Sequence, residues 1–242
     1  MDQILDFIYQ NSLFVLLFAL ALPLLASIWV RVVYSKYKKI DVHSGLTGAQ
    51  VAERIIHVYR LTSSDFTGVS VEPVKGVMTD HYSPKEKVVR LSEGVHGESS
   101  IAAIGIAAHE CGHAIQDGER FIPNKVRTVL FPVANIGSRF GPYLVFIGII
   151  IASFGMIAAG EVMISIGILL FAFAVLFYIV TLPVEINASM RAVRVLKESS
   201  MLTDKELAGA KKVLFAAAMT YVAAAVTSVL MLLRFLAFRS RR

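Results

Sequence analysis

Three long apolar runs constrain the fold of this 242-residue chain more than any other feature of its sequence. They cover residues 13–30, 143–183 and 213–233, and Glu161 is the only charged side chain inside them. A helix needs about 20 apolar residues to cross the roughly 30 Å hydrocarbon core of a bilayer. The middle run is long enough for two such helices, and we expect the chain to turn near Gly160 and Glu161.

The predicted fold class is a membrane α-helical protein with about four transmembrane helices. We expect these helices at residues 11–33, 143–160, 162–183 and 213–233. The chain is 56% apolar and 17% charged, whereas soluble domains have about 45–50% and 25%. This composition excludes a disordered protein and an ordinary soluble domain. Because residues 1–12 carry no Lys or Arg, we expect the first run to remain as an anchor and not to be cleaved as a signal peptide.

The positive charges indicate how the helices are oriented. Of the 24 Lys and Arg residues, 14 lie in residues 31–142 and six in residues 183–212, so the positive-inside rule places both segments in the cytoplasm. Four full crossings would put the basic tail on the opposite side, and this tail contains Arg234, Arg239, Arg241 and Arg242. Either the tail breaks the rule or the last run does not fully cross. Basic loops beside anionic lipid explain the net charge of +6, and no nucleic-acid partner is expected.

Residues 34–142 are expected to form a small cytoplasmic α+β domain. Thr47 and Gln50 have the spacing of a capping box at the start of a helix over residues 47–59. Short runs rich in β-branched residues follow, and Ser83-Pro84-Lys85-Glu86 suits the type I turn of a hairpin. An apolar helix over residues 99–117 completes the domain. It is short for a membrane span, so it is predicted to be a buried core helix.

That helix contains His109-Glu110-Cys111-Gly112-His113, which is an H-E-x-x-H motif. Positions four apart lie on the same face of a helix, so His109 and His113 can point imidazole nitrogens at one metal ion. Glu110 lies one residue round from His109, where it can reach a metal-activated water as a general base. The alternative is that both histidines are ordinary core residues. Cys111 faces away from them and is expected to pack in the core.

A catalytic zinc site usually has three protein ligands and leaves the fourth position for water. The metzincin pattern is absent, because Gln116 and Glu119 occupy the positions of its Gly and its third ligand. The better candidate is Glu185, where the third predicted span reaches the cytoplasmic boundary. We expect residues 184–212 to form a cytoplasmic helix that carries this ligand. The alternative for Glu185 is a solvated charge at a helix start.

Several blocks of the chain resemble a known family. H-E-x-x-H on a helix after a hairpin, with a distant E-x-x-A, resembles the membrane gluzincins and implies a zincin-like domain. More closely, and over nearly its whole length, the chain resembles the YugP-like family of neutral zinc metallopeptidases of bacterial membranes. The blocks that carry this resemblance are Gly45-Leu46-Thr47-Gly48-Ala49, Asp80-His81-Tyr82-Ser83-Pro84, Ala107-Ala108-His109-Glu110, Leu182-Pro183-Val184-Glu185 and residues 214–221.

The resemblance implies one zinc ion and assigns it three ligands, namely His109, His113 and Glu185. It also implies Glu110 as the catalytic residue. The gluzincin pattern has an acidic residue four positions after the third ligand, where it orients a ligand histidine. Ser189 stands at that position here, and Asn187 and Asp80 are alternatives for the role. The candidate groups for stabilising the oxyanion are His81, Tyr82, His96 and Arg191.

The sequence therefore predicts a zinc-dependent, multi-pass membrane endopeptidase of the cell membrane, which hydrolyses peptide bonds with Glu110 as general base. Its expected partners are the lipid bilayer and peptide or protein substrates, among them membrane or misfolded proteins. The alternative is a non-catalytic membrane scaffold whose metal site only stabilises the fold. A site-2-type protease would need a partner Asp in another span, and none is present.

Overall fold

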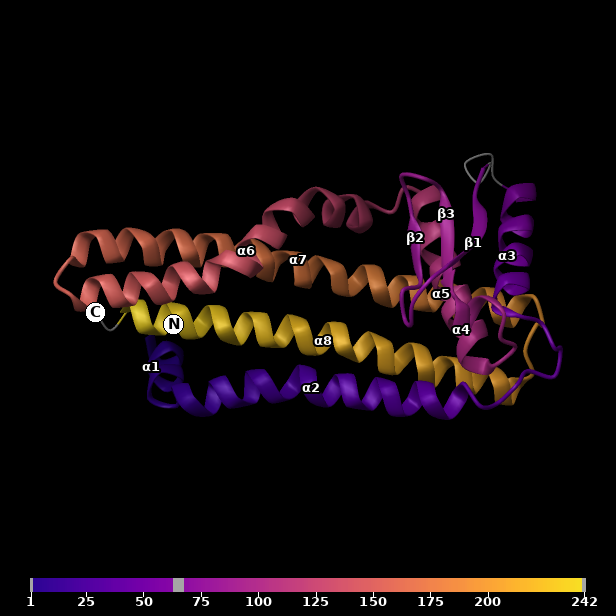
Figure 1. The fold of residues 1–242 in the computed structure, drawn as a ribbon, viewed down its shortest axis with the longest axis horizontal. Coiled ribbons are helices and arrows are strands. Elements are labelled where there is room, and N and C mark those ends of the chain that lie inside the picture. The colour runs from indigo at the N-terminus through magenta and orange to yellow at the C-terminus, as the bar shows by residue number, and fades with distance from the viewer. Residues whose placement is uncertain (1, 63–67, 241–242) are drawn as a thin grey trace. The chain divides into compact units, whose positions relative to one another are not determined.

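The computed structural model describes residues 2–62 and 68–240 (Figure 1). Arg241 and Arg242 of the basic tail lie outside the described residues. The elements are, in order, α1 (Asp2–Gln10), α2 (Ser12–Tyr37), α3 (Gly48–Thr62), β1 (Ser70–Val74), β2 (His81–Ser83), β3 (Val88–Ser92), α4 (Glu93–His96), α5 (Ile101–Gly118), α6 (Ile122–Ser153), α7 (Ile157–Glu198) and α8 (Asp204–Ser240).

Four of the described helices are long and apolar enough to cross a membrane. They are α2, α6, α7 and α8, and the most apolar segment of each has a mean hydropathy between 1.5 and 2.7. The predicted number of four apolar helices is confirmed. The remainder of the mostly helical chain includes one small sheet of three strands.

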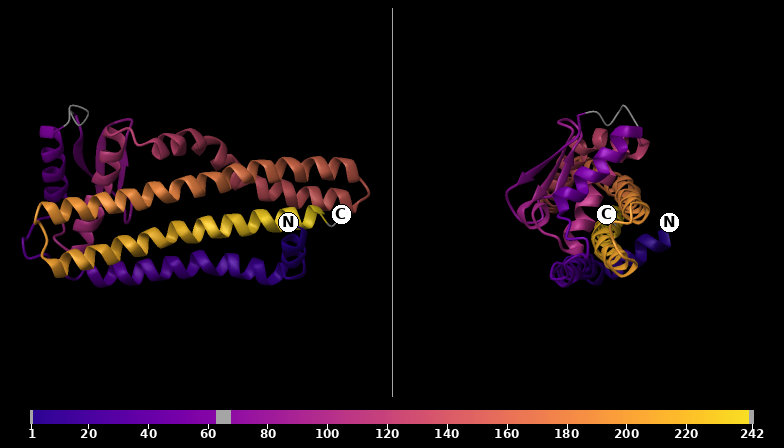
Figure 2. Two further views of the ribbon diagram at one scale, coloured as in Figure 1. Left: turned by 180° about the vertical axis from the view of Figure 1, so that it is seen from behind. Right: turned by 90° about the vertical axis from the view of Figure 1, so that its right-hand side faces the viewer.

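The chain divides into two compact units, which are described separately. The first unit comprises Met1–Ala26, Lys125–Leu182 and Tyr221–Arg242, and the second comprises Ser27–Asn124 and Pro183–Thr220. The helices α2, α6, α7 and α8 each contribute residues to both units. Figure 2 draws the ribbon from two further sides.

In the first unit, α6 and α7 pack closely at glycines. A Cβ atom at Gly148 would lie 2.8 Å from the carbonyl oxygen of Gly160, and one at Gly141 would lie 2.9 Å from that of Gly167. Such distances are too short for any side chain larger than hydrogen. Small residues that let helix backbones approach are a main source of helix association in lipid.

The turn between α6 and α7 lies at Phe154–Met156, not near Gly160 and Glu161 as predicted. Gly155 has a φ angle of 90° there, which a glycine adopts without the steric penalty of a Cβ atom. Gly160 and Glu161 are already within α7. The prediction was wrong because Gly160 serves helix packing, whereas Gly155 makes the turn.

In the first unit, α8 packs against α6 and α7, as the contact between Phe235 and Phe171 shows. Arg239 of α8 has its Nε atom 3.9 Å from Oε2 of Glu161, close to the turn at Gly155. Phe238 of α8 also meets Tyr9 of α1, with ring centroids 5.4 Å apart. The C-terminal end of α8 therefore lies at the same end of this unit as the turn.

The second unit contains the sheet, in the order β1-β3-β2. β1 pairs with β3 in parallel, and β2 pairs with β3 antiparallel, with Tyr82 opposite Val89. The hairpin predicted at Ser83-Pro84-Lys85-Glu86 is thus confirmed. The capping box at the start of α3 is confirmed as well, because the Thr47 N–H donates to Gln50 Oε1 at 3.0 Å and the Gln50 N–H donates to Thr47 Oγ1 at 3.3 Å.

α5 lies in the hydrophobic core of the second unit. Ile104 of α5 is fully buried, and the same core contains residues from α3, β3, α7 and α8, including Ile55, Leu91, Leu196 and Ala210. The prediction of a buried core helix is confirmed. A motif on such a helix is held rigidly, because its helix is packed against several other elements.

Candidate metal centre

α5 presents His109 and His113 one turn apart on the same side. Ser100 caps the start of this helix, since its Oγ accepts a hydrogen bond from the Ala103 N–H at 3.2 Å. The centroids of the two imidazole rings are 4.7 Å apart, and the ring planes are inclined by 82°. The helical spacing of the motif therefore brings the two rings together, as the sequence predicts.

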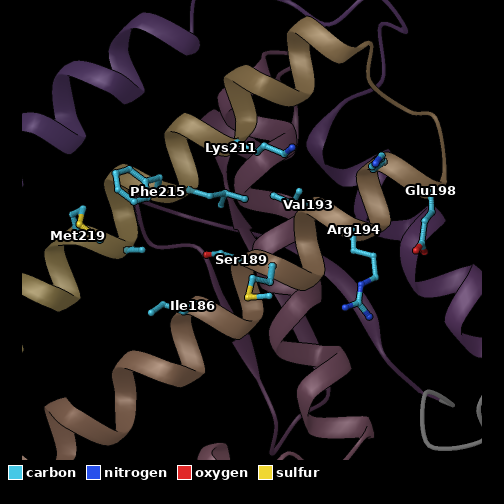
Figure 3. Close-up of a pocket in the computed structure, with 12 residues that line it drawn as sticks. Ile186, Ser189, Val193, Arg194, Glu198, Lys211, Phe215 and Met219 are labelled. Carbon is cyan, nitrogen blue, oxygen red and sulfur yellow. The ribbon is translucent and has the colours of Figure 1, made fainter.

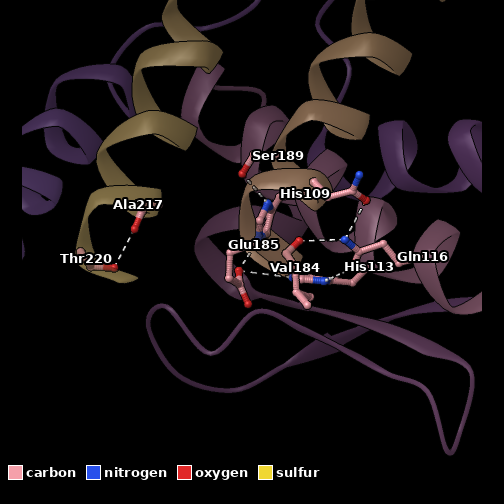
Figure 4. A network of polar contacts seen from close by, with 9 residues as sticks. His109, His113, Gln116, Val184, Glu185, Ser189, Ala217 and Thr220 are labelled. Atoms are coloured by element: carbon pink, nitrogen blue, oxygen red, sulfur yellow. Dashed lines mark hydrogen bonds and ion pairs between the residues drawn. The ribbon is translucent and has the colours of Figure 1, made fainter. Parts of the chain in front are cut away.

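α7 brings Glu185 to these two rings (Figure 4). Its Oε2 atom lies 3.3 Å from Nε2 of His109 and 3.5 Å from Nε2 of His113. One ligand atom from each of the three residues lies within 4.8 Å of the other two. Glu185 is 2% exposed, so its carboxylate is not the solvated helix-start charge that the alternative reading required.

The close approach of α5 to α7 depends on Gly112, which is one of the two unspecified positions of the H-E-x-x-H motif. A Cβ atom at Gly112 would lie 2.5 Å from the carbonyl oxygen of Ala188 in α7. Ala188 is itself fully buried. Gly112 thus lets α7 lie directly against α5 at Ala188, which is three residues after Glu185.

The outer nitrogen of each histidine has a hydrogen-bond partner. Nδ1 of His109 lies 3.2 Å from Oγ of Ser189, and Nδ1 of His113 lies 3.0 Å from Oε1 of Gln116. Nδ1 of each ring is thus engaged by these oxygens, and Nε2 is the nitrogen on the side of Glu185. Hydrogen bonds of this kind set the tautomer and the ring orientation of metal-binding histidines.

Gln116 is the residue of this network that sequence reasoning missed. It is fully buried, and its Nε2 donates to the Val184 carbonyl at 2.7 Å and to Asn187 Oδ1 at 3.0 Å. It therefore ties His113 to the segment of α7 that carries Glu185. The signal was present, because Gln116 follows His113 by three residues and so lies on the same helical face.

Asn187 and Arg191 extend the network away from the ligand atoms. Arg191 Nε donates to Asn187 Oδ1 at 2.7 Å, and Arg191 Nη1 lies 2.7 Å from Glu119 Oε2. Glu119 directly follows α5, so this ion pair joins the end of α5 to α7. Asn187 and Arg191 thus contact Gln116 or its neighbours and not the histidine rings.

Glu110 is 8% exposed, and its carboxylate has no hydrogen-bond or ion-pair partner among the described residues. The Glu110 oxygens are not among the buried polar atoms that lack a partner, so they retain access to solvent. The carboxylate is therefore accessible to a water molecule and is not engaged by another side chain of the described residues. The neighbouring Cys111 behaves as predicted, because it is buried and lies 3.8 Å from the Ala52 carbonyl.

The other candidate residues lie in the sheet and around α4. Tyr82 donates its hydroxyl proton to Asp117 Oδ2 at 3.0 Å, and burial together with the Asp117 charge raises the pKa of Tyr82. His81 Nδ1 lies 2.8 Å from the Thr79 carbonyl. Asp80 accepts hydrogen bonds from the backbone N–H and the hydroxyl of Ser92, at 2.7 and 2.9 Å.

None of these interactions connects Asp80, His81 or Tyr82 with the ligand cluster, within the described part of the chain. His96 lies in the last turn of α4, outside the cluster as well. Asp80 is engaged in holding Ser92 at the end of β3, so it does not orient a ligand histidine in this structure. Of the two alternatives to Ser189, Asn187 alone enters the hydrogen-bond network of the cluster.

The electrostatics of the cluster favour positive charge at its centre. Burial by itself lowers the pKa of His113, but the hydrogen bond to Glu185 and the charges of Glu110 and Glu185 outweigh burial, and the pKa is raised. A centre that attracts a proton in this way attracts a metal cation by the same Coulomb interaction.

The donor set fits zinc. Two imidazole nitrogens and one carboxylate oxygen are borderline ligands of the type that Zn²⁺ prefers, and three protein ligands leave a position for water. Among the described residues, this group of His, Cys, Asp and Glu side chains has three members. A structural zinc site would have four.

Comparison with known proteins identifies the family. The model of the family described as "Putative neutral zinc metallopeptidase" matches residues 12–240. The chain belongs to this family. It is also 43% identical over 223 residues to the "Putative membrane protease YugP" of Bacillus subtilis (strain 168), which covers 92% of this chain and 94% of that protein. No solved structure matches the chain.

Membership of the neutral zinc metallopeptidase family agrees with the donor set of the cluster. The family model extends from the start of α2 to the end of α8, so it includes both the H-E-x-x-H helix and Glu185. The relative is named a membrane protease, and this chain has four helices long enough to span a membrane. The chain is therefore a multi-pass membrane member of the family.

Proposed function

We propose that this protein is a zinc-dependent, membrane-bound endopeptidase. The observation that carries the proposal is the cluster of the partly buried His109 and His113 with the buried Glu185, beside which the carboxylate of Glu110 has no side-chain partner among the described residues. The family description and the name of the relative support zinc and proteolysis. The donor set and the free carboxylate are what hydrolysis by a metal-activated water requires.

A bound zinc ion would supply a Lewis acid that polarises the scissile carbonyl and makes a water molecule more acidic. Glu110 takes the proton of that water as general base and delivers it to the leaving amine as general acid. Ser189 and Gln116 hold the two imidazoles through Nδ1, so that Nε2 of each would be available to a bound ion. Gln116 also keeps Glu185 in place through the Val184 carbonyl.

The substrate can be held in an extended form by β2. In the order β1-β3-β2, this strand is an edge strand and pairs on one side with β3. Its other edge can add a substrate strand through main-chain hydrogen bonds. The hydrogen bond from Tyr82 to Asp117 ties this strand to the helix that carries His109 and His113.

We also propose that the metal centre lies on the cytoplasmic side of the membrane. Residues 34–142 and 184–212 would together form a zincin-like cytoplasmic domain, because these segments carry 19 of the 24 Lys and Arg residues. Its substrates would be membrane proteins or misfolded proteins on that side of the membrane. Arg191 forms an ion pair with Glu119, so it is a weaker candidate for stabilising the oxyanion than the sequence alone indicates.

The competing function is a membrane scaffold with a structural metal site. A closed structural site uses four protein ligands, whereas the described residues offer three at this centre. The open position and the free Glu110 favour the peptidase. The count of protein ligands around a bound ion is therefore the observation that separates the two functions.

The test compares wild type with Glu110→Gln and with the matched control Glu53→Gln, which changes an exposed carboxylate on α3. Each purified protein is analysed for metal by mass spectrometry and assayed on a fluorescent protein substrate with and without a chelator. We expect about one zinc per chain in all three, and chelator-sensitive activity that falls at least about 100-fold in Glu110→Gln alone. Full activity in Glu110→Gln would refute the assignment.

A further inference from the structure

A groove of about 700 Å³ lies between the last part of α7 and the first part of α8, within the second unit (Figure 3). Its wall is apolar over most of its length and includes Ile186, Met190, Val193, Leu214, Phe215 and Met219. Met190 is 59% exposed and Phe215 57% exposed. Contiguous exposed apolar surface of this kind marks an interaction site.

The charged residues of the groove gather at one end. Arg194, Lys197 and Lys211 line it there, and Glu198 is the one carboxylate among the lining residues. In Figure 3, Arg194 and Lys211 lie toward one end of the two helices, whereas Ile186 and Met219 lie toward the other. The groove therefore suits a ligand with an anionic head and an apolar tail.

A second hollow adjoins the groove on the other side of α8. It is lined by Trp29, Val33, Lys36, Tyr37 and Lys212, together with the same Lys211 and Phe215 that line the groove. Tryptophan, tyrosine and lysine together are typical of the level of lipid headgroups in a membrane protein. Trp29 also meets Phe215, with ring centroids 5.9 Å apart. The basic end of the groove thus has the composition of a headgroup layer.

The backbone around the groove argues against an extended peptide as its occupant. All its lining residues are helical, so their N–H and C=O groups are used within α7 and α8. An extended peptide needs free main-chain partners of its own. An acyl chain needs none, because it gains from contact with apolar side chains alone.

We propose that this groove is a binding site for an anionic phospholipid, with an acyl chain along the apolar wall and the phosphate between the side chains of Arg194, Lys197 and Lys211. Basic pockets between membrane helices bind anionic headgroups in this way. The site is separate from the metal chemistry proposed above. Ser189, which hydrogen-bonds to His109, also lines the groove, so the bound lipid would adjoin the metal centre.

The test uses protection of an introduced cysteine in the full-length protein. Met190→Cys places a thiol in the groove, while the native Cys111 is 1% exposed and contributes little background. The rate of labelling by a water-soluble maleimide is measured in nanodiscs of phosphatidylcholine with increasing phosphatidylglycerol of the same acyl chains. We expect phosphatidylglycerol to slow labelling, and inorganic phosphate to have no effect.

Two matched double variants then test the charges. Lys197→Gln with Lys211→Gln removes two groove cations, whereas Lys75→Gln with Lys85→Gln removes two equally exposed cations elsewhere. We take each groove lysine to contribute as much to binding an anionic lipid as one Lys near a membrane surface does. Losing both should then raise the phosphatidylglycerol fraction needed for protection about 30-fold, whereas the second pair should leave it unchanged. Equal protection by both lipids, equal effects of both pairs, or protection by an apolar peptide and not by lipid would overturn the proposal.

Discussion

Gln116 Oε1 lies 3.0 Å from Nδ1 of His113, and the amide of the same side chain donates to the Val184 carbonyl next to Glu185. One fully buried side chain thus connects a histidine of the H-E-x-x-H helix with the segment that carries the third candidate ligand. The geometry of the cluster depends on this connection, since α5 and α7 are far apart in the sequence.

Replacing Gln116 separates the two roles of its side chain. Gln116→Leu removes every hydrogen bond of the network, so we expect zinc affinity to fall about 10–100-fold and the free energy of unfolding to fall by about 1–3 kcal/mol. Gln116→Glu keeps an acceptor for His113 but loses the donor to Val184. It should therefore lose less zinc affinity than Gln116→Leu does, while it also lowers the thermal midpoint in detergent. Equal zinc affinity in wild type and Gln116→Leu would contradict this role.

Gly112→Ala should force α5 and α7 apart. The new methyl group would lie 2.5 Å from the Ala188 carbonyl oxygen, and neither backbone can yield easily. We expect a lower thermal midpoint and weaker zinc binding than in wild type. Gly105→Ala on the same helix is the control, because its methyl group would lie 3.5 Å from the Ala210 side chain, which is ordinary contact. The prediction fails if the two variants behave alike.

The pH dependence of stability should change sign when zinc binds. The pKa of His113 is raised in the fold, so without metal its protonated form adds stability at low pH, and this stability is lost as pH rises through the raised pKa. Zinc needs the neutral ring, so zinc affinity should increase as pH rises. Thermal midpoints between about pH 6 and pH 8 should fall without zinc and rise with it.

His57→Gln is the control for this measurement, because His57 is an exposed residue on α3. It should leave both trends in place, whereas His113→Gln should abolish them. The same direction of pH dependence with and without zinc would show that His113 does not bind the ion.

The ends of α8 should lie on opposite sides of the membrane. Arg239 pairs with Glu161 near the α6–α7 turn, so the C-terminal end of α8 lies at the same end of the first unit as this turn. We therefore expect a reporter fused to the C-terminus and one inserted in the hairpin at Pro84–Lys85 to report opposite compartments. If both reporters read the cytoplasm, the last run does not cross completely.

Much of the fold could be predicted from the sequence, because the patterns that indicate it lie within short segments of the chain. The apolar runs determined the number of candidate spans, Thr47 and Gln50 determined the start of α3, and the spacing of His109 and His113 placed two rings on one face of a helix. The turn at Gly155 was missed because a glycine in a turn and a glycine in helix packing have the same sequence signal.

Only the tertiary structure decided how the cluster is completed. The sequence named Glu185 as a candidate, but the packing of Gly112 on Ala188 is what brings its carboxylate to 3.3 Å from His109. The structure also decided that Ser189 and Gln116, and not Asp80, hold the histidines. Hydrogen bonds and close backbone contacts between distant segments depend on positions in space, and no local pattern of residues encodes them.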